Sequence, residues 1–534
     1  MGFHTFEKLV QAMASPDFYP HPADSFEIRE THISKIFLAG DLAYKLKKPL
    51  DLGFLNFTTL EKRLHFCSQE IKLNRRLAPD VYLGVVPICL ENETYHIEGP
   101  GEVVEYAVKM RRLPERSTLS HMLETGRIHK GQVHALAGLL AGFYDRPPEP
   151  APEADLGTWA TVSKNCMENF TQTADLVGQL FDERLFNIVR SACLAFLKRH
   201  RPLFDKRVRS GKVLDCHGDL RAEHIYFMDD QVRIIDCIEF NHRFRYEDMA
   251  SDLAFLAMDL DARGHSETAQ DLLAEIARQT GDADLFVLLG FYKCYRAMVR
   301  LKVACIRVRE TDVTEPETSR LQAEIETYLN LAYSYAVGFT RPVLWVVCGI
   351  PASGKSTIAG QIGRAFGISV LRSDVIRKEL FSASPADPSR QAFESGIYTR
   401  GATALTYGRM FLRAQEEIEK GNSVVLDATF GTRHFRKEAL RLAADMDATI
   451  FFVECTARDK VLKKRLARRE SRPSLSDARL VHFDDFRKGF EALTEIGPEQ
   501  RILVDTENPV EECMNRILLN EYIVPPDGLS PPAP

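Results

Sequence analysis

Apolar and polar positions follow two different patterns along the 534 residues of the chain. The pattern predicts short strands and turns around one helix over residues 26–105. It predicts mostly helix over 117–330, with short strands at 213–215 and 232–236. From residue 343 onward, apolar strands at 343–348, 424–426, 449–453 and 502–504 alternate with amphipathic helices. This alternation predicts a parallel sheet with helices on both faces.

Proline and a change of pattern mark the domain boundaries. The proline-rich stretch 146–152 predicts a surface loop, and a long helical pattern ends near residue 337, just before the first apolar strand. The chain ends in a second proline-rich stretch, which predicts disorder. We therefore expect one domain over residues 1–339, a second over 340–522 and a disordered tail over 523–534.

The composition, 45% hydrophobic and 27% charged, is that of a soluble globular protein. A net charge of -6 argues against broad nucleic-acid binding, although a local basic groove is compatible with it. No apolar run is long enough to span a bilayer, and no export signal precedes the first domain, so we expect a cytoplasmic protein with no membrane contact. The 11 cysteines are scattered singly, as expected of buried thiols in a reducing compartment. The oligomeric state stays open.

A complete phosphate-binding motif follows the first strand of the second domain. It has the form G-x-x-x-x-G-K-S-T and consists of Gly349-Ile350-Pro351-Ala352-Ser353-Gly354-Lys355-Ser356-Thr357. In the order strand, glycine-rich turn and helix, backbone N–H groups surround phosphates and the helix dipole favours their charge. We expect Lys355 to reach the β- and γ-phosphates and Ser356 to bind Mg²⁺. A chance glycine turn is the alternative, and the complete motif in this context disfavours it.

Two carboxylates are expected near this motif. Asp374 follows the second predicted strand, at 368–371, and so lies at the edge of the sheet where ligands bind. There it could accept the proton of an acceptor hydroxyl, with Arg377 orienting the pair; helix capping by Asp374 is the alternative. Asp427 ends an apolar strand, a pattern typical of a Mg²⁺ ligand.

A basic run over residues 463–473 follows the strand at 449–453. Such a run is often a solvated helix face, but in small P-loop kinases an arginine-bearing lid closes over the transferred phosphoryl group. We select Arg465 and Arg468 as lid arginines, with Arg469 or Arg472 as substitutes.

These motifs resemble a group of P-loop kinases that includes zeta toxins, polynucleotide 5′-hydroxyl kinases and gluconate kinase. The resemblance covers about residues 342–520 and rests on G-I-P-A-S-G-K-S-T, S-D-V-I-R, L-D-A-T-F and R-L-A-R-R. It implies an α/β P-loop domain that uses ATP and Mg²⁺, with Asp374 as general base. It does not specify the acceptor.

A second set of motifs lies in the first domain. Asp219 stands in the sequence His217-Gly218-Asp219-Leu220, and Asp236 ends the following short strand. This is the layout of kinase catalytic and metal-binding loops, in which Asp219 would accept a hydroxyl proton and Asp236 would bind Mg²⁺. His217 is expected to orient the loop.

These residues resemble the aminoglycoside phosphotransferase and choline kinase branch of the protein-kinase-like fold, over about residues 25–310. The resemblance implies a bilobal α+β domain in which Lys45, or next Lys47, contacts ATP and Glu70 pairs with that lysine. The chain departs from the family in having His224 where a metal-binding Asn is usual, and it lacks a G-x-G-x-x-G loop. Imidazole is a poor ligand for Mg²⁺. The domain therefore either transfers phosphate with an altered metal site or binds a ligand without turnover.

Three acidic residues follow the predicted metal-binding strand. Asp252 is expected to cap or brace the next helix. Glu239 and Asp248 either face an acceptor cleft or lie in a solvated loop.

Together the two domains resemble bacterial fusions of an aminoglycoside phosphotransferase-like domain with a P-loop kinase. The leading hypothesis is an ATP-dependent phosphotransferase acting on a hydroxyl of a small molecule. The alternatives are a polynucleotide 5′-hydroxyl kinase and a nucleotide-gated regulator whose first domain is a pseudokinase.

Overall fold

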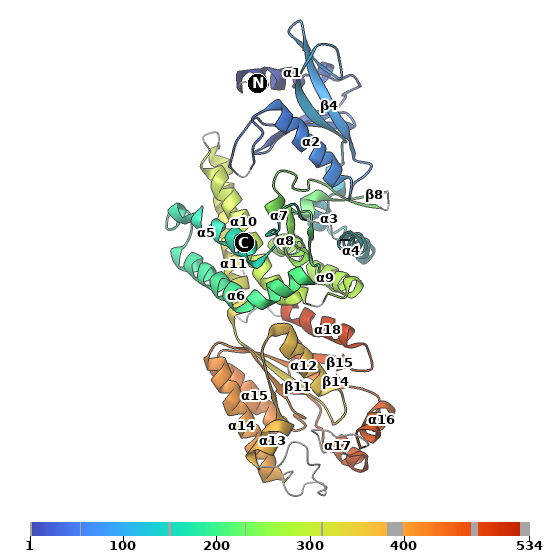
Figure 1. The fold of residues 1–534 in the computed structure, drawn as a ribbon, viewed down its shortest axis with the longest axis vertical. Coiled ribbons are helices and arrows are strands. Elements are labelled where there is room, and N and C mark those ends of the chain that lie inside the picture. Colours follow the sequence, from blue (N-terminus) through green and yellow to red (C-terminus); the bar gives the residue numbers. More distant parts are fainter. Residues whose placement is uncertain are drawn as a thin grey trace. The chain divides into compact units, whose positions relative to one another are not determined.

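The computed structural model describes residues 3–53, 55–147, 151–229, 231–282, 284–310, 313–381, 399–470 and 479–523. The chain forms two compact units, the first of residues 1–280 and 292–332 and the second of residues 281–291 and 333–534 (Figure 1). The boundary that we propose at residue 340 coincides with the end of helix α11 (Glu315–Thr340), whereas the two units divide inside that helix. From residue 524 onward, the proposed disordered tail lies outside the described residues.

A six-stranded antiparallel sheet forms the N-terminal part of the first unit. In pairing order its strands are β1 (Phe26–Glu30), β2 (Ser34–Ala39), β3 (Leu42–Lys47), β6 (Glu102–Arg111), β4 (Tyr82–Glu91) and β5 (Thr94–Ile97). Successive residues of a strand face opposite sides. In β3, Tyr44 and Leu46 therefore pack with helix α1 (Phe3–Met13), and Ala43 packs with α2 (Leu60–Asn74). Lys45 and Lys47 lie on the α2 side.

The remainder of the first unit is mostly helical. Its helices are α3 (Leu119–Glu124), α4 (Lys130–Tyr144), α5 (Trp159–Thr171), α6 (Glu183–Arg209), α7 (His242–Arg245), α8 (Met249–Ala262), α9 (Ser266–Thr280), most of α10 (Leu285–Val308) and much of α11. Two short sheets pair β7 (Val213–Asp215) with β10 (Tyr246–Asp248) and β8 (Ile225–Met228) with β9 (Gln231–Ile234). The sequence pattern predicted β7 and approximately β9. It missed β8 and β10.

The second unit contains a five-stranded parallel sheet. Its order is β12 (Ser369–Arg372), β13 (Val424–Asp427), β11 (Val343–Cys348), β14 (Thr449–Thr456) and β15 (Arg501–Asp505). The helices between and after these strands are α12 (Lys355–Phe366), α13 (Ser373–Leu380), α14 (Arg400–Glu419), α15 (Arg433–Asp445), α16 (Asp459–Glu470), α17 (Phe483–Lys488) and α18 (Val510–Ile523). Each predicted strand is present to within three residues at either end.

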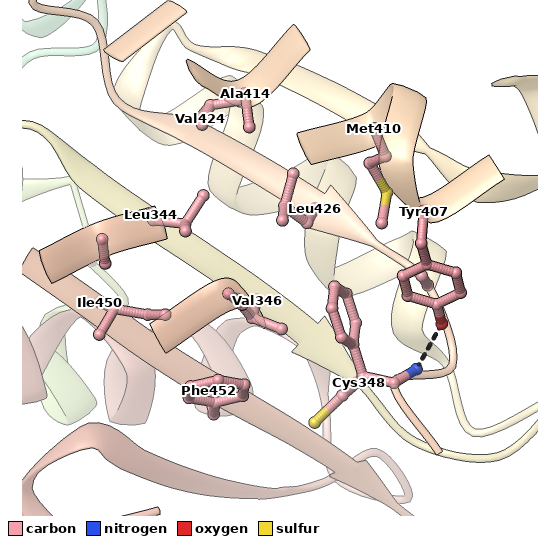
Figure 2. Close-up of a cluster of buried hydrophobic side chains, with 14 of the residues drawn as sticks. Leu344, Val346, Cys348, Tyr407, Met410, Ala414, Val424, Leu426, Ile450 and Phe452 are labelled. Carbon is pink, nitrogen blue, oxygen red and sulfur yellow. Dashed lines mark hydrogen bonds between the residues drawn. The ribbon is translucent and has the colours of Figure 1, made fainter. Parts of the chain in front are cut away.

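The two faces of this sheet are covered by different helices. On one face, Val346 and Leu426 belong to a buried cluster that includes Met410 of α14 and residues of α15 (Figure 2). On the other face, the ring of Trp345 lies 5.6 Å from that of Phe366 on α12. The predicted parallel sheet with helices on both faces is therefore confirmed. Over the described part of the chain, no helix combines the length and the apolarity needed to cross a membrane.

Candidate functional site

The loop between β11 and α12, residues 349–354, is called the phosphate loop. Its backbone requires glycine at two positions. Gly349 has a φ of 135°, and a Cβ atom there would lie 2.5 Å from the carbonyl oxygen of Cys455. Gly354 has a φ of 90°, and Ala352, although not a glycine, has a φ of 65°. The amide of Gly349 also donates to the carbonyl of Thr429 at 3.1 Å. The loop is thus a fixed turn at the N-terminus of α12, where backbone N–H groups lack partners within the helix.

Lys355 begins α12 and is electrostatically coupled to two carboxylates. Its Nζ donates to the carbonyl of Ile350 at 2.9 Å. Burial lowers the pKa of Lys355 below its ordinary value, and Asp427 and Asp374 oppose that shift. Ser356 follows on the same helix with an exposed side chain. In the strand pairing, Asp427 is opposite Val347, two residues before the loop, and opposite Arg372, two residues before Asp374, so the loop and both predicted carboxylates lie at one edge of the sheet.

Asp374 lies in the first turn of α13, after the N-cap residue Arg372, so the capping alternative for Asp374 is wrong. Burial raises the pKa of the Asp374 carboxyl, and the neighbouring carboxylate of Asp427 raises it further. Asp427 is buried at the end of β13, with Oδ2 3.2 Å from Nε of Arg372. Arg377 is also buried, and its Nη1 donates to Oγ1 of Thr403 at 3.3 Å.

Arg465 and Arg468, the predicted lid arginines, both lie on α16. Arg465 contacts the phosphate loop: its Nη1 is 3.4 Å from the carbonyl oxygen of Ala352 and donates to Oγ1 of Thr506 at 2.9 Å. Arg469, one of the substitutes, is on the same helix, whereas the other, Arg472, lies outside the described residues.

A cavity of about 450 Å³ opens beside the phosphate loop. Its walls come from the loop, helices α12, α16 and α18, and the segment after β15. The lining residues are Ala352, Gly354, Thr357, Ile358, Arg465, Arg468, Arg469, Thr506, Asn508, Val510 and Cys513. The cavity therefore combines a basic wall with an apolar one.

The donor atoms near the loop fit Mg²⁺ bound together with a nucleotide. The Ser356 hydroxyl and the Asp427 carboxylate are hard oxygens, and they follow strands β11 and β13, which pair with each other. Mg²⁺ in such sites takes one or two protein ligands and completes its shell with phosphate and water. In the described part of the chain, no three His, Cys, Asp or Glu side chains form a metal-binding group by themselves.

In the first unit, two lysines of β3 share one buried glutamate of α2. Nζ of Lys45 is 2.9 Å from Oε1 of Glu70, and Nζ of Lys47 is 2.7 Å from Oε2. Lys45 also lies 2.6 Å from Oδ1 of Asp236, and Lys47 also pairs with Glu239. Burial opposes the charge of Lys45, but Asp236 and Glu70 outweigh it and hold the Lys45 pKa well above its ordinary value. The expected pair of Lys45 and Glu70 is present, and Lys47 belongs to the same network.

Asp219 lies in the loop after β7 and is held by Arg221 through two hydrogen bonds of 2.9 and 3.0 Å. Burial opposes the charge of Asp219, but Arg221 and then His224 outweigh it, so the Asp219 pKa lies well below its ordinary value. His217 is buried, and its Nε2 lies 2.9 Å from the carbonyl oxygen of Ile235. This contact fits the expected role of His217 in orienting the loop.

His224 lies between the two candidate carboxylates of the first unit. Its Nδ1 is 2.8 Å from the backbone carbonyl oxygen of Asp219, an acceptor, so Nδ1 carries a proton. Its Nε2 is 3.7 Å from Oδ2 of Asp236 and 3.4 Å from Nη2 of Arg221. Because Mg²⁺ prefers oxygen ligands, His224 does not fit Mg²⁺, and the oxygen donor at this position is the carboxylate of Asp236.

The three acidic residues after β9 are all buried, which corrects the expectation of an acceptor cleft or a solvated loop for Glu239 and Asp248. Glu239 binds Lys47. Asp248 binds Arg207 at 2.8 and 2.6 Å and caps α8. Asp252 does not cap that helix; it accepts the backbone amides of residues 217 and 218, both at 2.9 Å. Glu239 therefore contacts β3, Asp248 joins the start of α8 to α6, and Asp252 holds the loop that contains His217.

Comparison with known proteins relates both halves of the chain to other proteins. The family model described as "AAA domain" matches residues 344–493. Proteins of Mycobacterium tuberculosis and Mycobacterium bovis, both described as uncharacterised, are 32% identical to this chain over 455 residues, covering 85% of this chain and 88% of each relative. The chain belongs to the family of these mycobacterial proteins.

Solved structures are similar to each half separately. A gluconokinase from Sinorhizobium meliloti is 18% identical, covers 34% of this chain and 94% of its own, and gives a TM-score of 0.26. A choline/ethanolamine kinase family protein from Mesorhizobium loti is 12% identical, covers 61% of this chain and 99% of its own, and gives a TM-score of 0.35. The AAA-domain match lies within the second unit, where the parallel sheet and the glycine-rich loop at the start of α12 confirm the expected P-loop domain.

Two residues that contact these sites were not singled out from the sequence. Thr506 follows β15, and its position at the same sheet edge as Asp427 is the one signal that could have found it. Arg221 stands two residues after Asp219, inside the motif itself, and a charged neighbour so close to a candidate base was a usable signal.

Proposed function

We propose that the second unit transfers the γ-phosphate of ATP, with Mg²⁺, to a hydroxyl group of a small molecule. The observation that carries this proposal is the placement of the phosphate loop, Asp427 and Asp374 at one edge of the parallel sheet, where Asp427 pairs with both Val347 and Arg372. A site that only bound nucleotide would have no need of a second carboxylate at this edge.

The donor nucleotide would occupy the loop and the cavity beside it. Residues 349–357 would surround the phosphates with backbone N–H groups, and Lys355 would contact the β- and γ-phosphates. The cavity of about 450 Å³ has room for a nucleoside, which would lie between the arginines of α16 and the apolar wall formed by Ile358 and Val510.

The Mg²⁺ ion would be held by Ser356 and Asp427. When bound, it neutralises charge on the transferred phosphoryl group. Both protein ligands are hard oxygens, as this ion prefers.

Asp374 would accept the proton of the acceptor hydroxyl. Because its pKa is raised, the carboxylate is a stronger base than an ordinary aspartate and so is better matched to neutral pH. Arg377 would orient Asp374 and the acceptor. The positive charge of Arg468, on α16, would stabilise the negative charge that develops on the phosphoryl oxygens.

A labelling screen on the full-length protein tests this function. The protein is incubated with γ-labelled ATP and Mg²⁺ against a panel of hydroxyl-bearing metabolites and a panel of oligonucleotides with free 5′ hydroxyls. We expect label in a small molecule, because the net charge of -6 disfavours a polyanionic acceptor. Label in oligonucleotides would refute this proposal and support the alternative hypothesis, a polynucleotide 5′-hydroxyl kinase. ATP binding without label in either panel would favour the nucleotide-gated regulator.

An Asp219→Asn variant tests whether the phosphoryl transfer takes place in the first or in the second unit. We expect it to label the same acceptor at the wild-type rate, because the proposed transfer takes place in the second unit. If Asp219→Asn abolishes labelling, the activity resides in the first unit.

A further inference from the structure

Helix α16 presents three arginines to the nucleotide cavity. Arg465 and Arg469 are four residues apart, so they lie on one face of the helix, one turn from each other. Both line the cavity and both are partly buried. Arg465 also makes hydrogen bonds to the segment after β15.

Arg465 is fixed to the protein. Its Nη1 donates to Oγ1 of Thr506 at 2.9 Å, and its Nη2 donates to the backbone carbonyl of Thr506 at 2.7 Å. A third contact, of 3.4 Å, reaches the carbonyl of Ala352 in the phosphate loop. A guanidinium engaged by several acceptors at once has little freedom to follow a phosphoryl group during transfer.

Thr506 connects this arginine to the phosphate loop. Its hydroxyl donates to the carbonyl of Ser353 at 2.8 Å, with the carbonyl oxygen of Thr456 at 3.1 Å as a second acceptor. Its own amide donates to Thr456 at 2.9 Å, which fixes Thr506 to the end of β14.

The Thr506 side chain also packs closely on the loop. A Cβ atom added to Gly354 would lie 3.0 Å from Cβ of Thr506. Gly354 and the Thr506 side chain therefore fill adjoining space, so a shift of Thr506 would displace the loop.

Arg469 lines the same cavity as Ala352 and Gly354 of the phosphate loop. It lies one turn of α16 beyond Arg465, which contacts that loop. Arg469 therefore faces the space in which a nucleotide bound to the loop would lie.

We propose that Thr506 and Arg465 are positioning residues, a clamp that joins the phosphate loop to α16, and that Arg469 acts beside Arg468 in contacting the phosphates of the bound nucleotide. This inference rests on the proposed nucleotide site. The sequence pattern gave the role of lid arginine to Arg465 and Arg468, with Arg469 as a substitute; here Arg469 takes the place of Arg465.

Equilibrium binding of MgADP to the full-length protein tests the clamp. Thr506→Val keeps the shape but removes the hydroxyl, so we expect MgADP to bind about 10-fold more weakly. Thr506→Ser restores the hydroxyl and should bind within about 2-fold of wild type. Lys464→Met, an exposed position on the same helix, is the matched control and should not change binding.

Arg465→Met supplies an independent variant if Thr506→Val does not fold. We expect it to weaken MgADP binding, and the double variant to lose less than the product of the two single losses, because the two side chains share a hydrogen bond. Wild-type affinity in Thr506→Val and Arg465→Met would overturn the clamp. MgADP binding needs no acceptor, so the clamp and the proposed transfer reaction can fail separately.

The rate of phosphoryl transfer tests the role of Arg469. We expect Arg469→Met to lower the rate of phosphoryl transfer at saturating ATP about 100-fold, with a KM for ATP close to that of wild type. An unchanged rate in Arg469→Met, together with a lowered rate and unchanged MgADP affinity in Arg465→Met, would reverse the two roles.

Discussion

Replacing Asp374 by Asn removes the charge of the proposed base while keeping nearly the same shape, and it has opposite effects on activity and stability. In the folded protein, burial and Asp427 raise the Asp374 pKa above its ordinary value of 3.8. Folding therefore favours the protonated form. The stabilising contribution of this carboxyl is fully present below its unfolded pKa and is lost as the pH rises through the folded pKa. At neutral pH the ionised side chain destabilises the second unit, and the neutral Asn does not.

The loss of activity has a definite size. A positioned general base typically accelerates a reaction about 10²–10⁴-fold, or about 3–5 kcal/mol of transition-state stabilisation. We expect Asp374→Asn to lose that much in kcat, with the KM for ATP little changed because Asp374 is directed to the acceptor. In the wild-type enzyme, the acid limb of the pH–rate profile should lie above the ordinary aspartate range.

Rates of γ-phosphate transfer and thermal melting curves, both measured from acid to neutral pH, provide the assay. Asp445→Asn, an exposed position at the end of α15, is the control and should match wild type in both. The melting temperature of Asp374→Asn should exceed that of wild type at neutral pH, and the difference should vanish in acid. A variant that keeps its kcat refutes the role as base. A variant that loses activity and also melts lower at neutral pH shows that Asp374 is structural.

Two further variants test the architecture around the sites. Gly349→Ala places a Cβ atom 2.5 Å from the carbonyl of Cys455 at a φ of 135°, so we expect weaker MgADP binding and a lower melting temperature of the second unit; wild-type binding would show that the loop tolerates another backbone. Asp248→Ala removes the carboxylate that the buried Arg207 guanidinium contacts, so we expect a loss of about 3–5 kcal/mol in the unfolding free energy of the first unit, measured by denaturant titration; a loss below about 1 kcal/mol would show that the buried pair is not needed.

The sequence was most informative where a strong local pattern coincides with the chemistry. Strands β11 and β13 are runs of buried, mostly apolar residues that the sequence pattern predicts directly. Their positions locate the loop that follows β11 and Asp427 at the end of β13. The pairing of Lys45 with Glu70 was predictable in the same way, because the family motif places one on a strand and the other on the adjacent helix.

Contacts between distant segments could not be derived from the sequence. Glu239 is an acidic residue in a polar stretch, and nothing local indicates that Lys47, nearly 200 residues earlier, neutralises it in the core. Thr506 is a single threonine after a strand, and its contacts with Ser353 and Arg465 depend on the parallel order of the sheet. Such long-range pairs decide which charges are buried and which face a ligand.

The most direct measurement of the central claim is transfer from γ-labelled ATP by full-length wild-type protein, Lys355→Ala and the control Lys437→Ala, an exposed lysine on α15. If the second unit is the transferring site, wild type and Lys437→Ala label the acceptor at the same rate and Lys355→Ala does not label it. Labelling by Lys355→Ala at the wild-type rate would contradict the account and place the reaction outside the P-loop unit.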